Sequence, residues 1–373
     1  MDGGGAPPPS ERAADMKILV LGGGAQGRVI ATDLARELGR PDRSGPPARI
    51  TVADVRDPRI AAPNLAWTQA DCSDPGVVVR LMREHDLAVG ALPSRYGLAT
   101  MRAAIVAKRD LVDVSFCAED ALDLDAEARA AGVAIVPDAG LAPGISNLVA
   151  GEAYARRGAP DELLIMVGGV ARDPSRPYGY TVTWSLDDLN EEYVRPARIV
   201  RDGRKVAVPV FSDLERVQVA GVGEMEAFLS DGLRSLMDTL PGVRTMEEKT
   251  LRWPGHVAAI RPLVAAGRLQ EELRARCTFD PPDDVVALVV RLRWRDGFEQ
   301  TTLVDRYDPA SRLTAMGRTT AFTTAVTAAT LADGIRPEPG VKPLEIVARD
   351  RRAFEAITEG LARRGVELVR TTG

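Results

Sequence analysis

The sequence predicts an α/β protein in which a doubly wound parallel sheet is joined to a second α/β domain built on a mixed sheet. Two observations predict the first part. Short apolar runs alternate with segments of helical spacing as far as Pro137, and six of these runs have the pattern of a strand. Six strands with helical crossovers form a parallel sheet. A third observation predicts the second part, because strand-like segments beyond about Asn147 alternate polar with apolar residues and lie further apart.

The first strand, helix and strand are the clearest elements. Residues 17–21 form an apolar run that ends at glycines, as a buried parallel strand does. Residues 26–38 repeat apolar residues at helical spacing. Residues 49–54 form a second strand that ends in an acid, after a connection rich in Pro and Gly. This order predicts a βαβ unit.

The remaining elements follow from the same patterns. In the first half, strands are expected at 66–69, 87–92, 111–114 and 133–137, and helices at 75–84, 99–107 and 123–131. In the second half, strands are expected at 163–168, 288–294 and 300–307. A helix rich in Ala and Thr at 319–332 is expected to return the chain to the first domain.

Composition excludes several classes of protein. The 373 residues exceed one ordinary core and fit two domains. A net charge of −5 without a Lys/Arg run argues against a nucleic-acid partner. Since no apolar stretch reaches roughly 18 residues and no secretory signal is present, we expect no membrane partner and a cytoplasmic location. Three cysteines without CxxC spacing and two histidines predict no metal site.

The motif Gly22-x-Gly24-x-x-Gly27 lies between the first strand and the first helix. Alone it is a weak signal, but this context predicts a dinucleotide site. The first glycine allows a tight turn, the second lets backbone N–H groups approach a pyrophosphate, and the third lets the helix pack close to the strand. Ala25 and Gln26 begin the helix, whose N-terminus attracts an anion. The alternative is a purely structural glycine turn.

The acid that ends the second strand bears on the choice of coenzyme. Asp54 can accept hydrogen bonds from the adenosine ribose hydroxyls and would repel a 2′-phosphate, which favours NAD over NADP. Val55, which follows it, is expected to border the same site. Arg56 could instead pair with a phosphate, so NADP stays open. The alternative role of Asp54 is a helix cap or a surface charge.

Other coenzyme contacts are expected from position alone. Asp71 and Cys72 follow the third strand and should border the adenine. Ala91, Leu92 and Pro93 end the fourth strand at the carboxyl edge of the sheet, where the nicotinamide half should lie.

These patterns divide the chain into a lead-in and two domains. Residues 1–15, rich in Gly and Pro, are expected to be disordered. Residues 16–146 are expected to form a dinucleotide-binding Rossmann domain, completed by residues 318–373. Residues 147–317 are expected to form the substrate-binding domain.

The constrained segment 137–147, together with the glycine loop, resembles the saccharopine dehydrogenase family, and within it the lysine 6-dehydrogenases. Blocks at 223–228, 248–256 and 316–320 are also similar, so the resemblance runs from Met16 to about Leu344. It implies a Rossmann domain, a second domain for a small amine or amino-acid substrate, and a homodimer. It also implies oxidation of an amine-bearing carbon with NAD or NADP. Residues 176–180 and 229–231 depart from the lysine 6-dehydrogenase pattern, which leaves the exact amine open.

The implied chemistry needs particular groups. An alkyl ammonium has a pKa of about 10 and must lose a proton before hydride can leave, and a substrate carboxylate needs a cation. His256 is our first candidate for the acid/base or substrate-orienting group, and Arg252 for the carboxylate. Glu224 or Asp231 could hold the ammonium, and Tyr180 could donate a hydrogen bond. Structural or surface roles are the alternative for each.

We therefore expect an NAD-preferring amino-acid dehydrogenase with lysine 6-dehydrogenase-like activity. One alternative is an enzyme of the same architecture that acts on a secondary amine or an imine. Others are an NADP-linked reductase and a non-catalytic NAD-binding regulatory module.

Overall fold

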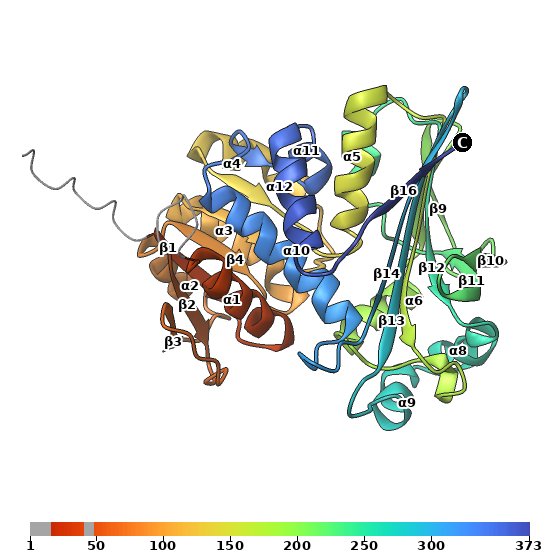
Figure 1. Cartoon of the computed structure of the whole chain (residues 1–373), viewed down its shortest axis with the longest axis horizontal. Helices are drawn as coiled ribbons and strands as arrows, with labels where there is room; N and C mark the ends of the chain where they lie inside the picture. Colours follow the sequence, from red (N-terminus) through yellow and green to blue (C-terminus); the bar gives the residue numbers. More distant parts are fainter. Residues whose placement is uncertain (1–15, 41–47) are drawn as a thin grey trace, which may run out of the picture.

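The computed structural model describes residues 16–40 and 48–373, which form two sheets with helices between and around them (Figure 1). The expected disordered lead-in, residues 1–15, lies outside the described residues. Within the described part of the chain, no helix is long and apolar enough to cross a membrane.

The first sheet has seven parallel strands in the order β15-β6-β5-β4-β1-β2-β3. These are β1 (Met16–Leu21), β2 (Ala48–Asp54), β3 (Leu65–Gln69), β4 (Leu87–Gly90), β5 (Asp110–Asp113), β6 (Ala134–Val136) and β15 (Gly340–Val341). Their helices are α1 (Ala25–Leu38), α2 (Pro75–Arg83), α3 (Gly97–Ala107) and α4 (Asp125–Ala131), with 3₁₀ turns at Ser94–Tyr96 and Ala121–Leu124. The expected doubly wound sheet is confirmed, and β15 is a strand that the pattern did not predict.

The second sheet has nine strands and is mixed. It contains β7 (Glu162–Ala171), β8 (Ala197–Arg201), β9 (Arg204–Val208), β10 (Glu215–Val219), β11 (Gly223–Leu229), β12 (Thr245–Arg252), β13 (Asp284–Trp294), β14 (Gly297–Arg306) and β16 (Val369–Thr372). β12 runs parallel to β7, whereas its other pairings and those of β13 are antiparallel. The expected mixed sheet is confirmed.

The remaining helices connect and cover the sheets. They are α5 (Ile145–Arg157), α6 (Leu186–Val194), α7 (Leu236–Thr239), α8 (His256–Ala265), α9 (Leu269–Arg276), α10 (Ala315–Ala332), α11 (Leu344–Val347) and α12 (Arg351–Ala362), with a 3₁₀ turn at Pro177–Gly179. Figure 1 shows α5 and α10 between the two sheets. α10 is buried on almost every side, as expected for a helix of small residues that packs against α1, β4 and β13.

The end of the chain contributes to both halves. α10 and β15 lie with the first sheet, whereas β16 pairs with β14 of the second. One hydrophobic core runs from Ile18 and Val20 of β1 to Leu288 and Val290 of β13. The two sheets are therefore held together by a shared core. Residues that follow the strands of the first sheet and residues of the second sheet line the same cavity.

Candidate active site

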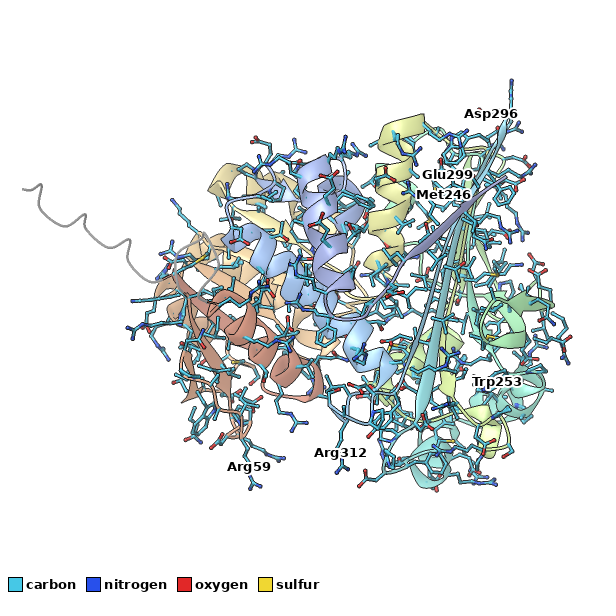
Figure 2. All side chains as sticks on the ribbon, viewed as in Figure 1. Arg59, Met246, Trp253, Asp296, Glu299 and Arg312 are labelled. Atoms are coloured by element: carbon cyan, nitrogen blue, oxygen red, sulfur yellow. The ribbon has the colours of Figure 1, made fainter. Side chains whose placement is uncertain are left out.

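A cavity of about 1400 Å³ lies between the two halves and connects the glycine loop with the second sheet. Its lining includes the loop after β1, the ends of β4 and β6, and residues of α6 and β12. Figure 2 marks the course of β12 with Met246 near its start and Trp253 just past its end, and the residues of β12 that line the cavity lie between these two. Arg312, before α10, also lines the cavity, and its side chain points outward in Figure 2.

Glycine is present at the three motif positions for different structural reasons. Gly22 has a φ of +97°, and a Cβ there would lie 2.6 Å from the Ala91 carbonyl oxygen. A Cβ at Gly27 would lie 1.9 Å from the Gly22 carbonyl oxygen. A Cβ at Gly24 would meet no atom of the described residues within 4 Å, and Gly24 lines the cavity. The chain itself therefore requires Gly22 and Gly27, whereas Gly24 leaves space that a ligand can occupy.

The start of α1 has the features of an anion site. Among the residues that the structure describes, no side chain caps this helix, and the N–H groups of a first turn have no partner within the helix. Ala25 and Gln26 line the cavity here. Gln26 Oε1 is buried without a hydrogen-bond partner in the described part of the chain, and such a group needs one. Open space and free backbone donors fit a dinucleotide whose pyrophosphate lies at this turn.

The other expected coenzyme contacts divide into two sets. Asp54 lines the cavity, and its carboxylate accepts hydrogen bonds from the backbone N–H of Gly23 at 2.7 Å and of Arg56 at 2.9 Å. Ala91, Leu92 and Pro93 also line the cavity. The described lining does not include Gly27, Val55, Asp71 or Cys72. Val55 and Asp71 are exposed and Cys72 is buried behind β2, with its Sγ 3.7 Å from the Ala53 carbonyl oxygen.

Polar side chains gather at the second-sheet end of the cavity. Because side chains alternate along a strand, Glu248, Thr250 and Arg252 of β12 share one face, and all three line the cavity. Ser230, just past β11, lies 2.6 Å from Glu248 and 2.7 Å from Thr250. Thr250 donates to Glu192 of α6 at 2.6 Å. The two carboxyls are thus joined through two hydroxyls.

Glu248 is the most perturbed acid of this group. It is buried, and burial raises its pKa to about 8, with the charges of Glu192 and Asp231 adding to the effect. The Ser230 hydrogen bond and the Arg252 charge oppose the rise but do not cancel it. A carboxyl that holds a proton at neutral pH beside a cavity is a common feature of catalytic sites.

Arg252 lines the cavity but already has partners within the protein. Its Nη2 lies 3.1 Å from Glu192 Oε1, its Nε donates to the Tyr193 hydroxyl at 2.7 Å, and its Nη1 donates to the Leu251 carbonyl at 2.9 Å. A substrate carboxylate at Arg252 would therefore have to compete with Glu192.

His256 lies behind Arg252, and the described cavity lining does not include it. Its Nδ1 is 2.8 Å from the Tyr178 carbonyl oxygen and its Nε2 is 2.8 Å from the Tyr193 hydroxyl. Burial and the Arg252 charge lower the pKa of His256 to about 3, so the ring is neutral. Nδ1–H therefore donates to the carbonyl and Nε2 accepts from Tyr193. This geometry supports a positioning role, in which His256 holds Tyr193 and, through it, Arg252.

The structure brings only one of the other three candidates to the cavity. Asp231 lines it and is paired with Arg198 at 2.8 and 2.9 Å. Tyr180 is fully buried, and its hydroxyl accepts a hydrogen bond from Trp184, which lines the cavity. Glu224 is exposed at the start of β11 and pairs with Arg216. Glu224 therefore lies outside the described lining of the cavity.

The sequence interpretation missed four polar residues of this cluster. They are Glu192, Ser230, Glu248 and Thr250. The period-two spacing of Glu248, Thr250 and Arg252 was a usable signal, but it indicates a shared face only once residues 245–252 are assigned as a strand. Glu192 and Ser230 come from separate elements, and only the fold brings them to β12.

Two family models match the two halves of the chain. A family model described as the saccharopine dehydrogenase NADP binding domain matches residues 18–136, and one described as the saccharopine dehydrogenase C-terminal domain matches residues 140–366. These matches confirm a nicotinamide dinucleotide as the class of coenzyme.

Curated relatives and a solved structure extend the similarity. The chain is 25% identical over 213 residues to saccharopine dehydrogenase (NADP(+), L-glutamate-forming) of Pyricularia oryzae. The aligned region covers 54% of this chain and 47% of that protein. It is 25% identical over 244 residues to the protein of the same name from Schizosaccharomyces pombe, covering 61% and 54%. The chain thus spans about half the length of these relatives. Apo saccharopine dehydrogenase (L-Glu forming) from Saccharomyces cerevisiae shares the fold, with a TM-score of 0.71 at 17% identity over 96% of this chain and 100% of that one.

Proposed function

Because the chain belongs to the saccharopine dehydrogenase family, we propose that it is a dinucleotide-dependent dehydrogenase that oxidises the carbon bearing the side-chain amine of an amino acid. The observation that carries this proposal is the cavity that joins the glycine loop to the carboxyl cluster of α6 and β12. The proposed coenzyme site and the proposed site for a cationic nitrogen therefore open into the same cavity.

Each end of the cavity has a distinct task in this reaction. Gly24, Ala25 and Gln26 would hold the coenzyme pyrophosphate, and the bound nicotinamide would supply the hydride acceptor. At the other end, the Glu192 carboxylate would attract the substrate ammonium and take its proton. Ala91 and Leu92 also line the cavity.

The charge balance of the substrate end favours a primary amine over a secondary-amine adduct. At this end, the cavity is lined by residues of α6 and the position after it, of the loop after β11, and of β12. They include four carboxyls, Asp188, Glu192, Asp231 and Glu248, and two guanidiniums, Arg195 and Arg252. Both guanidiniums are already bonded to carboxylates, Arg195 to Glu191 and Arg252 to Glu192. A ligand rich in amines and poor in carboxylates fits this surface best. A lysine–glutamate adduct carries three carboxylates, and a lysine-like substrate carries one.

For the coenzyme, we keep the preference for NAD as a proposal based on Asp54. Its carboxylate lines the cavity next to the glycine loop, where a 2′-phosphate would meet negative charge. The cytoplasmic location and the homodimer stay predictions.

Initial rates with a panel of amines test the proposed function. We expect NAD reduction with L-lysine or a closely related diamino acid, and none with a lysine–glutamate secondary amine. A rate with the secondary amine alone would favour the alternative enzyme. Coenzyme binding by calorimetry without turnover of any amine would favour the non-catalytic module. Glu192→Gln should abolish most of the rate, and Glu224→Gln, which changes an exposed carboxyl outside the cavity, should preserve it.

A further inference from the structure

Glu192 and Glu248 are joined by a continuous chain of short contacts. Glu248 Oε2 lies 2.6 Å from Ser230 Oγ, which lies 2.7 Å from Thr250 Oγ1, which lies 2.6 Å from Glu192 Oε1. The four residues come from β12, from the loop after β11 and from α6, and all line the cavity. Glu248 is buried, whereas Glu192 is partly exposed.

The number of hydrogens decides how this chain can be protonated. Each of the three contacts needs one hydrogen, and the two hydroxyls supply only two. With both carboxyls ionised, one contact therefore has no hydrogen and two oxygens face each other through lone pairs. One added proton on either carboxyl gives three hydrogens for three contacts. When the proton is on Glu192, one hydrogen lies in each of the three contacts. If each of these hydrogens crosses its contact to the next oxygen, the proton ends on Glu248.

We infer that Glu192, Thr250, Ser230 and Glu248 form a proton relay that takes the proton of the substrate nitrogen at Glu192 and holds it at Glu248. The inference rests on the proposed function for the source of the proton. An N–H bond of the substrate ammonium breaks, the nitrogen keeps the electron pair, and an O–H bond forms at Glu192. The shift along the chain starts from the form in which both carboxyls are ionised, which is the form of Glu248 present above about pH 8. It leaves Glu192 ionised and Glu248 protonated, with no change in the number of hydrogens on either hydroxyl.

The surroundings of the two acids favour this direction. The charged groups near Glu248 are Asp231 from the loop after β11, Glu192 from α6 and Arg252 from its own strand. Burial of Glu248 has a larger effect than the positive charge of Arg252, so the pKa of Glu248 is raised to about 8. Arg252 donates to the same Glu192 oxygen that accepts from Thr250. The ionised form of Glu192 therefore has two donors, whereas Glu248 lies where a charge is costly.

Thr250 offers a matched pair of variants for the test. Thr250→Val removes the hydroxyl at similar volume and breaks the chain, whereas Thr250→Ser retains it. In the full-length protein with coenzyme, we expect Thr250→Val to lower kcat/KM for amine oxidation by about 100-fold, within the range of general acid–base catalysis, and to change the pH profile. Thr250→Ser should retain the wild-type kcat/KM and the wild-type pH profile. Equal losses in the two variants, or a Val variant with the wild-type rate and profile, would overturn the relay.

A second measurement needs no substrate. Infrared titration of the wild-type protein should show a protonated-carboxyl C=O band that disappears as the pH rises through about 8. Glu248→Gln should lack this band, Thr250→Val should shift its frequency, and Thr250→Ser should retain it. A wild-type protein without the band refutes the relay even if it oxidises amines. A protein that has the band and its Thr250 dependence but oxidises no amine leaves the relay in place and refutes the proposed function.

Discussion

The substitution Glu248→Gln should remove a pH-dependent loss of stability from the wild-type protein. Glu248 is buried, and burial raises its pKa from 4.5 to about 8. Between these values the folded protein binds one proton more than the unfolded chain. The free energy of unfolding therefore falls by about 1.4 kcal/mol for each pH unit as the pH rises. This contribution to stability is full below pH 4.5 and is lost above about pH 8, a total of roughly 5 kcal/mol.

Thermal unfolding as a function of pH measures this difference. An unfolding entropy of about 2.1 cal/mol/K per residue converts roughly 5 kcal/mol into about 6 °C if the whole chain unfolds together. The Tm of Glu248→Gln minus that of the wild type should therefore rise by about this amount between pH 5 and pH 9. Glu224→Gln, at an exposed position, is the matched control and should show no such rise. If Glu248→Gln and the wild type have parallel Tm profiles, Glu248 is ionised at neutral pH and the electrostatic argument fails.

Two further substitutions test the support of the cluster and the choice of coenzyme. Tyr193→Phe removes the hydroxyl between Arg252 and His256 and should cost about 1–3 kcal/mol in chemical unfolding, since it leaves buried polar groups unpaired; an unchanged midpoint would show that the hydroxyl is dispensable. Asp54→Asn retains an acceptor for the Gly23 N–H but removes the charge, so the ratio of NADH to NADPH affinity in fluorescence titrations should fall about tenfold, the effect of roughly 1.4 kcal/mol. An unchanged ratio would place coenzyme selectivity elsewhere.

The coenzyme half could be predicted from the sequence because local geometry fixes it. Gly22 needs a positive φ, and Gly27 must lie against the Gly22 carbonyl, so both positions identify the loop without knowledge of distant residues. Ala91, Leu92 and Pro93 followed from the rule that parallel strands end at one edge. Asp71 and Val55 show the limit of that rule, because the end of a strand does not determine which side chains face the cavity.

The substrate half could not be predicted to the same depth because tertiary pairing creates it. Glu192 reaches the cavity on a short helix, and Ser230 lies opposite β12 only because β11 pairs with it. The rarity of His256 and its sequence block predict an acid/base or substrate-orienting group. Burial and the Arg252 charge make its ring neutral, and no sequence pattern reports that burial.

Coenzyme affinity of a Gly24→Val variant tests the account most directly. Residues 16–40 and 48–373 leave room for this side chain, since a Cβ at Gly24 meets none of their atoms within 4 Å and the φ of Gly24 is −69°. The same space is needed by a pyrophosphate at the start of α1. We predict an unchanged Tm and a loss of NADH affinity of about 100-fold, or roughly 2.8 kcal/mol. Full affinity in a variant of wild-type stability would show that the coenzyme does not lie against this loop.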